Sequence, residues 1–150
     1  MGYVTVKNIT LRAATADDPA FARGLYLGNM REVTKRLLAW DEAPQTANFD
    51  ARFVSSEVNI ICLDEQDVGW MQIAESGGEV FLKQFFIHPD FQRRSSDTEL
   101  LQDLLSRAAQ AGKTVTLGVV KTNPARSLYE RQGFRITSED QYKVYMEKNP

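Results

Sequence analysis

The sequence predicts an α+β protein, with a single mixed, mostly antiparallel β-sheet of about seven strands and helices on both faces. Strand-length apolar runs and segments with helical apolar spacing follow one another in the order β, α, α, β, β, β, α, β, α, β, β. Three consecutive strands in the middle of the chain are joined by short polar or glycine-rich turns, which favour antiparallel pairing. Because its 150 residues contain no linker or internal repeat, we expect residues 1–150 to form one domain.

The N-terminal third is expected to contain one strand and two helices. Residues 4–12 alternate loosely between apolar and polar side chains and predict the strand. Asp17-Asp18-Pro19 has the features of a helix start, and apolar residues at mostly helical spacing extend this helix to about Leu38. Residues 40–44, which read Trp-Asp-Glu-Ala-Pro, are expected to break the helix, and residues 48–55 to form a second, short one.

The middle of the chain predicts three strands, at residues 58–63, 68–74 and 79–87. The polar residues 64–67 and the segment Ser76-Gly77-Gly78 are expected to be the turns between them.

The C-terminal part predicts two helices and three more strands. Leucine and alanine residues at helical spacing between Leu100 and Ala109 indicate an amphipathic helix, which Gly112 ends. Strands are expected at residues 114–120, 134–137 and 141–147, with a short helix between the first and second of them.

Composition excludes several classes of function. The chain is 43% hydrophobic and 25% charged with a net charge of -2, so neither nucleic acid nor an anionic membrane is an expected partner. One cysteine and one histidine make a metal site and an internal disulfide unexpected. Apolar runs of membrane length and a signal peptide are not found, so a cytoplasmic location is expected.

Residues 123–134, which read Asn-Pro-Ala-Arg-Ser-Leu-Tyr-Glu-Arg-Gln-Gly-Phe, contain all the signals of a short helix. Asn123 suits the N-cap, and Pro124 suits the first helical position, where no N–H is needed. Gly133 suits the left-handed residue just past the helix end. Tyr129 lies near the middle of this helix, where it can be either a packing aromatic or a functional side chain.

This segment closely resembles the C-terminal motif of the GNAT superfamily of acyl-CoA-dependent N-acetyltransferases. The predicted order of elements is also that of the GNAT fold, so the resemblance covers nearly the whole chain. In that family the matching tyrosine commonly protonates the coenzyme A thiolate as it leaves, which implies that Tyr129 is the general acid. A phenol with a pKa near 10 is protonated at neutral pH and can donate to a thiolate, whose ordinary pKa is about 8.5.

The family's second motif resembles residues 87–101. Ile87, Pro89, Gln92 and the two leucines 100–101 match it, but the two positions that hold glycine in the family hold Ser95 and Asp97 here. In the family this loop binds the coenzyme diphosphate with backbone N–H groups at a helix N-terminus.

The two motifs together imply a set of coenzyme-binding residues. They are Phe86, Ile87, Gln92, Arg93, Arg94, Ser95, Ser96, Asp97, Thr98, Asn123 and Arg126. The two arginines at 93 and 94 would supply positive charge, whereas Asp97 places a negative charge where an anionic ligand should lie. An alternative is that Ser96 and Glu99 form a capping box, which satisfies the helix end without a ligand.

The acceptor side is less well marked. Trp40, Glu42, Trp70 and Gln84 are candidates for the acceptor pocket, although large aromatic residues usually belong to a core. Many relatives carry a catalytic glutamate four residues before the position of Ile87, where this chain has Lys83. Asp41, Glu42 or a water held by Gln84 are therefore alternatives for the general base.

The resemblance implies direct transfer of an acetyl group from acetyl-CoA to a primary amine, with no metal. The acceptor would be a small-molecule amine or a peptide N-terminus, and a homodimer is expected. The missing glycines support an alternative, in which the protein is a ligand-binding or interaction module with weak or lost coenzyme A binding.

Overall fold

A computed structural model describes residues 9–35, 40–91 and 96–150. Its elements follow the predicted order, with two additional 3-10 turns at Ser55–Glu57 and Pro89–Phe91. The elements are β1 (Ile9–Ala13), α1 (Pro19–Thr34), α2 (Glu42–Arg52), β2 (Val58–Leu63), β3 (Gln66–Ser76), β4 (Glu79–Ile87), α3 (Ser96–Gln110), β5 (Thr114–Val120), α4 (Ala125–Arg131), β6 (Arg135–Glu139) and β7 (Lys143–Lys148).

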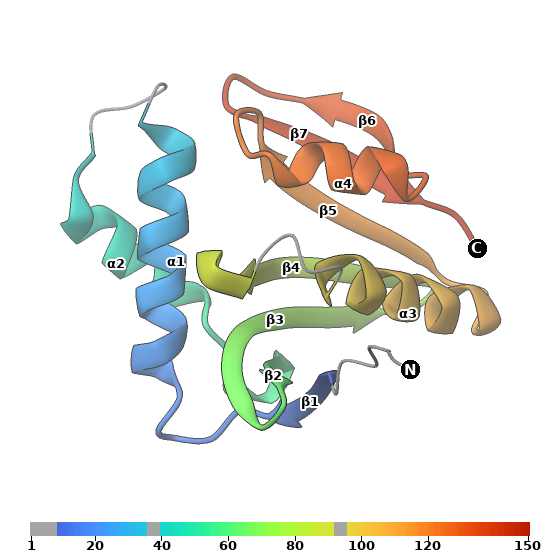
Figure 1. The fold of residues 1–150 in the computed structure, drawn as a ribbon. Helices are drawn as coiled ribbons and strands as arrows, with labels where there is room; N and C mark the ends of the chain where they lie inside the picture. The colour runs from blue at the N-terminus through green and yellow to red at the C-terminus, as the bar shows by residue number, and fades with distance from the viewer. Residues whose placement is uncertain (1–8, 36–39, 92–95) are drawn as a thin grey trace.

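The seven strands form one sheet in the order β1-β2-β3-β4-β5-β7-β6 (Figure 1). Every neighbouring pair is antiparallel except β4 and β5, which are parallel. The predicted fold class is therefore confirmed. Of the first predicted strand, residues 4–8 lie outside the described part of the chain, and β1 begins at Ile9.

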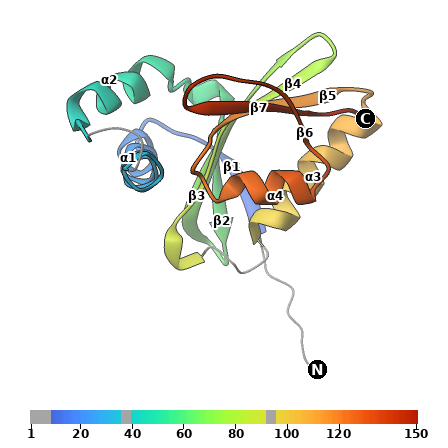
Figure 2. The same cartoon turned by 90° about the horizontal axis from the view of Figure 1, so that it is seen from above.

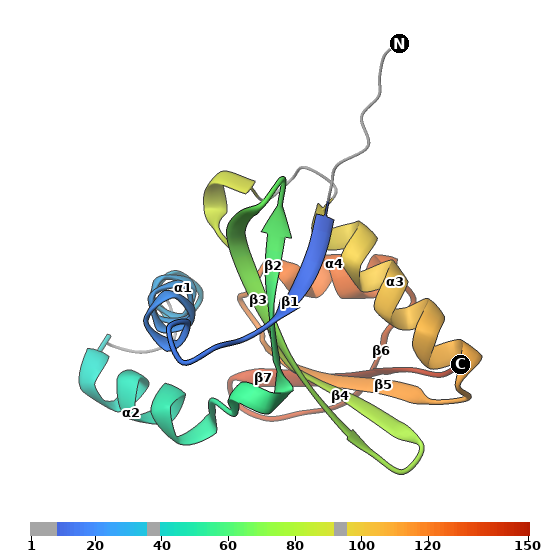
Figure 3. The same ribbon diagram turned by 90° about the horizontal axis from the view of Figure 1, so that it is seen from below.

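Helices cover the two faces of the sheet in pairs, with α1 and α2 on one side and α3 and α4 on the other (Figures 2 and 3). Neighbouring strand residues alternate between these faces. Ile60 and Phe86 pack in the cluster beneath α1 and α2, whereas Ile61 and Ile87 pack with Leu100 of α3. Each apolar strand in the middle of the sheet is therefore buried on both sides, as its composition predicts.

Backbone conformations confirm the predicted turns only in part, because Gln66 and Asp67, expected in the first turn, already belong to β3. The loop between β2 and β3 is Asp64 and Glu65, which both have positive φ angles, of 50° and 69°, as in a two-residue hairpin turn. Gly77 in the next hairpin has a φ of 58°, and Gly133 after α4 has a φ of 96°.

The prediction for the second helix was wrong at its start. Helix α2 begins at Glu42, within the segment expected to break the chain, and ends at Arg52. Pro44 lies in the first turn, where backbone N–H groups have no partner within the helix, so a proline is tolerated there.

An ion-pair cluster anchors the start of α1 to the sheet. The Arg12 guanidinium lies 2.8 Å from a carboxylate oxygen of Asp18 and 2.9 Å from one of Asp67. The hydrogen bond from Arg12 lowers the pKa of Asp18 to about 2, despite the opposing effect of burial. This contact fixes the position of α1, which lines the cavities described below.

Candidate active site

The central feature of the sheet is a gap between β4 and β5. These parallel strands pair with each other only where Glu79, Val80 and Phe81 face residues 114–116. Beyond this point β4 continues to Ile87 and β5 to Val120, but the two strands no longer pair with one another. A bulge in β4 places Lys83 without a direct partner on β3, because Gln72 pairs with Gln84 and the next β3 residue pairs with Leu82. The irregularity thus lies at Lys83, and Ile87 ends the strand.

The edge of β4 presents backbone groups to this gap. The N–H of His88 donates to the carbonyl oxygen of Val68 at 2.7 Å, which makes these two residues a hydrogen-bonded pair of the ladder. Since such pairs alternate along antiparallel strands, Phe86 bonds to β3, and the backbone groups of Phe85 face the gap.

A larger cavity, of about 1100 Å³, lies between α1 and the residues at the starts of α3 and α4. It is bounded by α1, by the end of β4 with the following turn, by the start of α3 and by the residues that lead into α4. Ile87, Asp97 and Thr98 line it together with Asn123 and Pro124.

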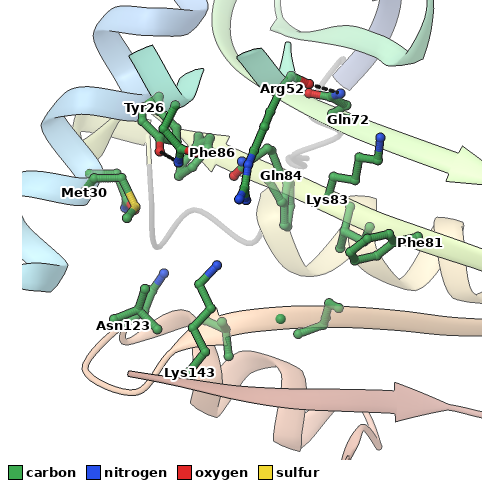
Figure 4. Close-up of a pocket in the computed structure, with 18 of the residues that line it drawn as sticks. Tyr26, Met30, Arg52, Gln72, Phe81, Lys83, Gln84, Phe86, Asn123 and Lys143 are labelled. Carbon is green, nitrogen blue, oxygen red and sulfur yellow. Dashed lines mark hydrogen bonds between the residues drawn. The ribbon is translucent and has the colours of Figure 1, made fainter. Parts of the chain in front are cut away.

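A smaller cavity, of about 570 Å³, opens on the side of α2 and β7 (Figure 4). Gln84 and Tyr129 line it. Four residues line both cavities, and they come from α1, from β4 and from the loop after β5: Asn29, Phe85, Phe86 and Asn123. The two cavities therefore meet at the gap between the parallel strands.

Tyr129 is 6% exposed and packs its ring edge-on against Phe134, with ring centroids 5.6 Å apart. Burial, and secondarily the charge of Asp97, raises the pKa of the Tyr129 hydroxyl above its usual range. The Tyr129 hydroxyl is therefore protonated at neutral pH in the wall of the smaller cavity. Its position combines the two alternatives left open by the sequence, because the ring packs in the core while the residue lines a cavity.

Asn123 and Arg126 occupy different environments. Asn123 caps α4, because its side-chain oxygen accepts a hydrogen bond from the N–H of Ala125 at 2.9 Å, and it also lines both cavities. Arg126 lines neither of the two cavities, and its Nε lies 3.7 Å from a carboxylate oxygen of Glu130.

The start of α3 borders the larger cavity. The Asp97 carboxylate accepts a hydrogen bond from the N–H of Thr98 at 2.8 Å, which uses one of the backbone donors at this helix end. Ser96 begins the helix, and the predicted residues Gln92, Arg93, Arg94 and Ser95 lie outside the described residues.

Of the four acceptor-pocket candidates, the structure brings only Gln84 to a cavity. Glu42 pairs with Arg31 at 2.9 Å, and the Arg31 guanidinium lies 5.1 Å from the centre of the Trp40 ring, so these two candidates form a cluster away from both cavities. Trp70 is 1% exposed and packs among aromatic rings in the core.

Sequence reasoning missed several polar residues of the cavity walls, among them Asn29 of α1, Arg52 at the end of α2 and Lys143 at the start of β7. Each stands alone in a segment without a motif, so no local pattern could identify it. It also missed a network in which Glu57 accepts hydrogen bonds from Lys83 and Gln72, both at 2.8 Å. These bonds lower the pKa of Glu57, mainly through Lys83.

The described residues contain neither a metal-binding cluster nor a membrane-spanning helix. No group of three or more histidine, cysteine, aspartate or glutamate side chains is placed to hold a metal ion in this part of the chain. No helix within residues 9–35, 40–91 and 96–150 is long and apolar enough to cross a membrane.

Comparisons with known proteins agree with this architecture. The chain is similar over 95% of its length to the PaiA N-acetyltransferase of Thermoplasma acidophilum in complex with coenzyme A, with a TM-score of 0.77, 14% identity and 99% of that chain covered. It is also similar over 99% of its length to a GCN5-related N-acetyltransferase of Rhodopseudomonas palustris, with a TM-score of 0.71, 19% identity and 100% of that chain covered. No curated protein matches the chain significantly.

The likeness to these solved structures concerns the fold, because the identities are low. A family model described as an acetyltransferase (GNAT) domain matches residues 31–147, which is most of the sequence. The chain belongs to the GNAT family of acetyltransferases.

Proposed function

We propose that this protein transfers an acetyl group from acetyl-CoA to a primary amine, with Tyr129 as the general acid. Membership of the GNAT family supports acyl transfer in general. The observation that carries the finer proposal is the meeting of two cavities at the gap between β4 and β5, because a two-substrate transfer needs two sites that open onto one point.

The larger cavity is the site for acetyl-CoA in this proposal. A solved structure with the same fold is a complex with coenzyme A, and the backbone groups of Phe85 face the gap, where an extended pantetheine arm can pair with a strand edge. A backbone N–H at this edge can also polarise the thioester carbonyl. The diphosphate would lie at the N-terminus of α3, beside Asp97 and Thr98.

The smaller cavity is the site for the amine. Attack on the thioester requires a neutral amine, yet no carboxylate is among the described residues that line this cavity. Its charged lining residues are cations, and nearby positive charge lowers the pKa of a bound ammonium group. We therefore propose that the amine loses its proton to water, and that the chain has no carboxylate base at this site.

Tyr129 completes the proposed reaction by protonating the coenzyme thiolate as it leaves. The raised pKa of its hydroxyl keeps the proton in place until the thiolate forms. A thiolate in a water-poor site also has a raised proton affinity, which reduces the pKa difference that the proton transfer must overcome.

Isothermal titration of the protein with acetyl-CoA tests this proposal most directly. We expect saturable binding with one coenzyme per chain, followed by release of free thiol when an amine is added. If no heat of binding is detected at about 1 mM acetyl-CoA, the affinity is too weak for the proposed reaction, and the proposal is wrong. Binding without thiol release from any amine would favour the alternative, a coenzyme-binding module.

Asp97 supports the alternative of weak coenzyme binding, because its negative charge lies beside the proposed diphosphate site. Replacing this residue tests that effect. Its carboxylate borders the site proposed for the diphosphate, so Asp97→Asn should tighten acetyl-CoA binding by about fivefold, which is about 1 kcal/mol. The amide oxygen of asparagine can still accept the hydrogen bond from Thr98, so helix α3 should remain capped.

The matched control for this prediction is Asp103→Asn, on the same helix. Asp103 pairs with Arg107 on the exposed side and lines neither cavity, so its loss should leave the dissociation constant of acetyl-CoA unchanged. Equal affinities for the wild type and Asp97→Asn would show that this carboxylate does not act on the coenzyme.

A further inference from the structure

Among the described residues, the charged side chains that line the smaller cavity are all positive. Arg52, Lys83 and Lys143 are the charged residues in its wall, and they come from α2, β4 and β7. The rest of the wall is polar or apolar, and it includes Met30 and Phe81.

Only one of the three cations has its charge matched by an ion pair. Lys83 Nζ lies 2.8 Å from a carboxylate oxygen of Glu57. Arg52 and Lys143 have no ion pair with any residue in the described part of the chain, and Lys143 is partly buried.

The carboxylate nearest to Lys143 in sequence is already engaged. Asp140 accepts hydrogen bonds from the Tyr145 hydroxyl at 2.8 Å and from the backbone N–H groups of Tyr142 and Lys143 at 2.9 and 2.8 Å. These bonds, led by that of the Lys143 backbone, lower the pKa of Asp140, which is exposed and is not part of the cavity wall. The charge of Lys143 also lowers the pKa of Asp140, but the Lys143 ammonium group forms no ion pair with this carboxylate among the described residues.

Figure 4 shows how the two unmatched cations lie. Arg52 reaches into the cavity from the end of α2, Lys143 reaches in from β7, and the two side chains point toward one another across the cavity. Two convergent cations in a partly enclosed space form a site for a carboxylate or phosphate group, since a guanidinium can bind either in a bidentate manner.

One wall residue shared by the two cavities has an unpaired polar atom. The side-chain oxygen of Asn29 is buried and has no hydrogen-bond partner among the described residues. Asn29 lines both cavities as a residue, but this oxygen itself is enclosed by protein, so the anion site rests on the two cations alone.

We propose that the acceptor is an amine that also carries an anionic group, either a carboxylate or a phosphate. Arg52 and Lys143 bind the anionic group, and apolar wall residues such as Met30 and Phe81 contact the body of the molecule. Polycationic amines are rejected by the same charges. This inference rests on the proposed function for its reaction, but the binding preference can be measured without turnover.

The first experiment compares acceptors that differ only in the anionic group. L-Phenylalanine is compared with 2-phenylethylamine for the carboxylate, O-phosphoethanolamine with ethanolamine for the phosphate, and spermidine represents polycations. We expect kcat/KM for at least one anionic member to exceed that of its neutral partner by roughly 10- to 100-fold, the range for hydrogen bonds to charged groups. Equal values within both pairs, or a preference for spermidine, would overturn the inference.

The second experiment changes the chain. Arg52→Gln and Lys143→Gln should each raise KM for the preferred anionic acceptor by roughly tenfold, with a clearly smaller effect on kcat/KM for the neutral partner and an unchanged KM for acetyl-CoA. Arg107→Gln is the control, because Arg107 is exposed on α3 and lines neither cavity. Equal losses for the anionic and neutral acceptors would contradict a role in binding the anion.

A third measurement separates failure of this inference from failure of the proposed function. The acetylated products N-acetyl-L-phenylalanine and N-(2-phenylethyl)acetamide, with the corresponding phosphate pair, are titrated into the protein alone. If acetyl-CoA does not bind but an anionic product does, the proposed function is wrong and the anion site stands. If acetyl-CoA binds and neither product pair differs in affinity, the inference is wrong and the transferase proposal stands.

Discussion

Replacement of Tyr129 by phenylalanine is expected to lower kcat for acetyl transfer by roughly 100-fold, because general acid catalysis commonly contributes at least that factor. The ring remains, so its packing against Phe134 is kept. KM for acetyl-CoA should change little, since the lost group acts on the leaving thiolate rather than on the bound ground state. Steady-state assays of thiol release with a primary amine measure both constants.

A structural role for the Tyr129 hydroxyl predicts a different outcome. No described residue forms a hydrogen bond with it, so its removal should leave the free energy of unfolding unchanged or slightly raised. Tyr142→Phe, which removes a hydroxyl outside both cavities, is the control and should keep full activity. Unchanged turnover in Tyr129→Phe would remove this residue from the acid role without excluding the transferase activity.

The pH dependence of the acetyl-transfer rate is a second test of Tyr129 as the general acid. Because burial raises the pKa of its hydroxyl above the usual range, the acid form persists to a higher pH than in an exposed tyrosine, whose pKa is near 10. The wild-type rate should therefore rise with pH as the amine loses its proton and then stay level up to about pH 10. A fall in rate between about pH 8 and 9 would show that another group donates the proton.

Gly69→Ala is expected to have the largest effect on stability. A Cβ atom at this position would lie 2.2 Å from the carbonyl oxygen of Phe86 and 3.1 Å from the Cα of Ile87. Both contacts are with backbone, so β3 and β4 must move apart rather than a side chain turning aside. We expect a loss of roughly 3 kcal/mol in the free energy of unfolding, at the upper end for overpacking.

The same substitution should also weaken acetyl-CoA binding, because Phe86 and Ile87 line the larger cavity. Gly78→Ala, in the hairpin that joins these strands, is the matched control: its added Cβ meets nothing within 4 Å. Chemical denaturation of both variants, together with titration of acetyl-CoA, tests the prediction. Equal stability of Gly69→Ala and the wild type would mean that the strand spacing can relax at no cost.

Most of the fold was predictable because its signals are local. The expected bounds of β2, β4 and β5 agree with the structure, since each strand is an apolar run that ends at a polar residue, a glycine or a proline turn. The left-handed angle at Gly133 and the cap formed by Asn123 were also readable, because both depend on residues within one helical turn. The start of α2 was not, since a proline can either end a helix or occupy its first turn.

The site was predictable only where motifs exist. The sequence identified Tyr129, Asn123 and Asp97, all of which line one of the cavities. It did not identify Arg52 or Lys143, because only the folded sheet brings the end of α2 and the start of β7 to one cavity. The assignment of Trp70 to a pocket could not be separated from a core position, since both environments are apolar.

The wall shared by the two cavities has a thermodynamic consequence. Phe85, Phe86, Asn29 and Asn123 each border both binding sites, so a ligand that shifts any of them on one side changes the surface offered on the other. Linkage requires this influence to be mutual: whatever factor the first ligand applies to the affinity of the second, the second applies to the first. Binding of one substrate at these proposed sites is therefore expected to change the affinity for the other through the four residues that they share.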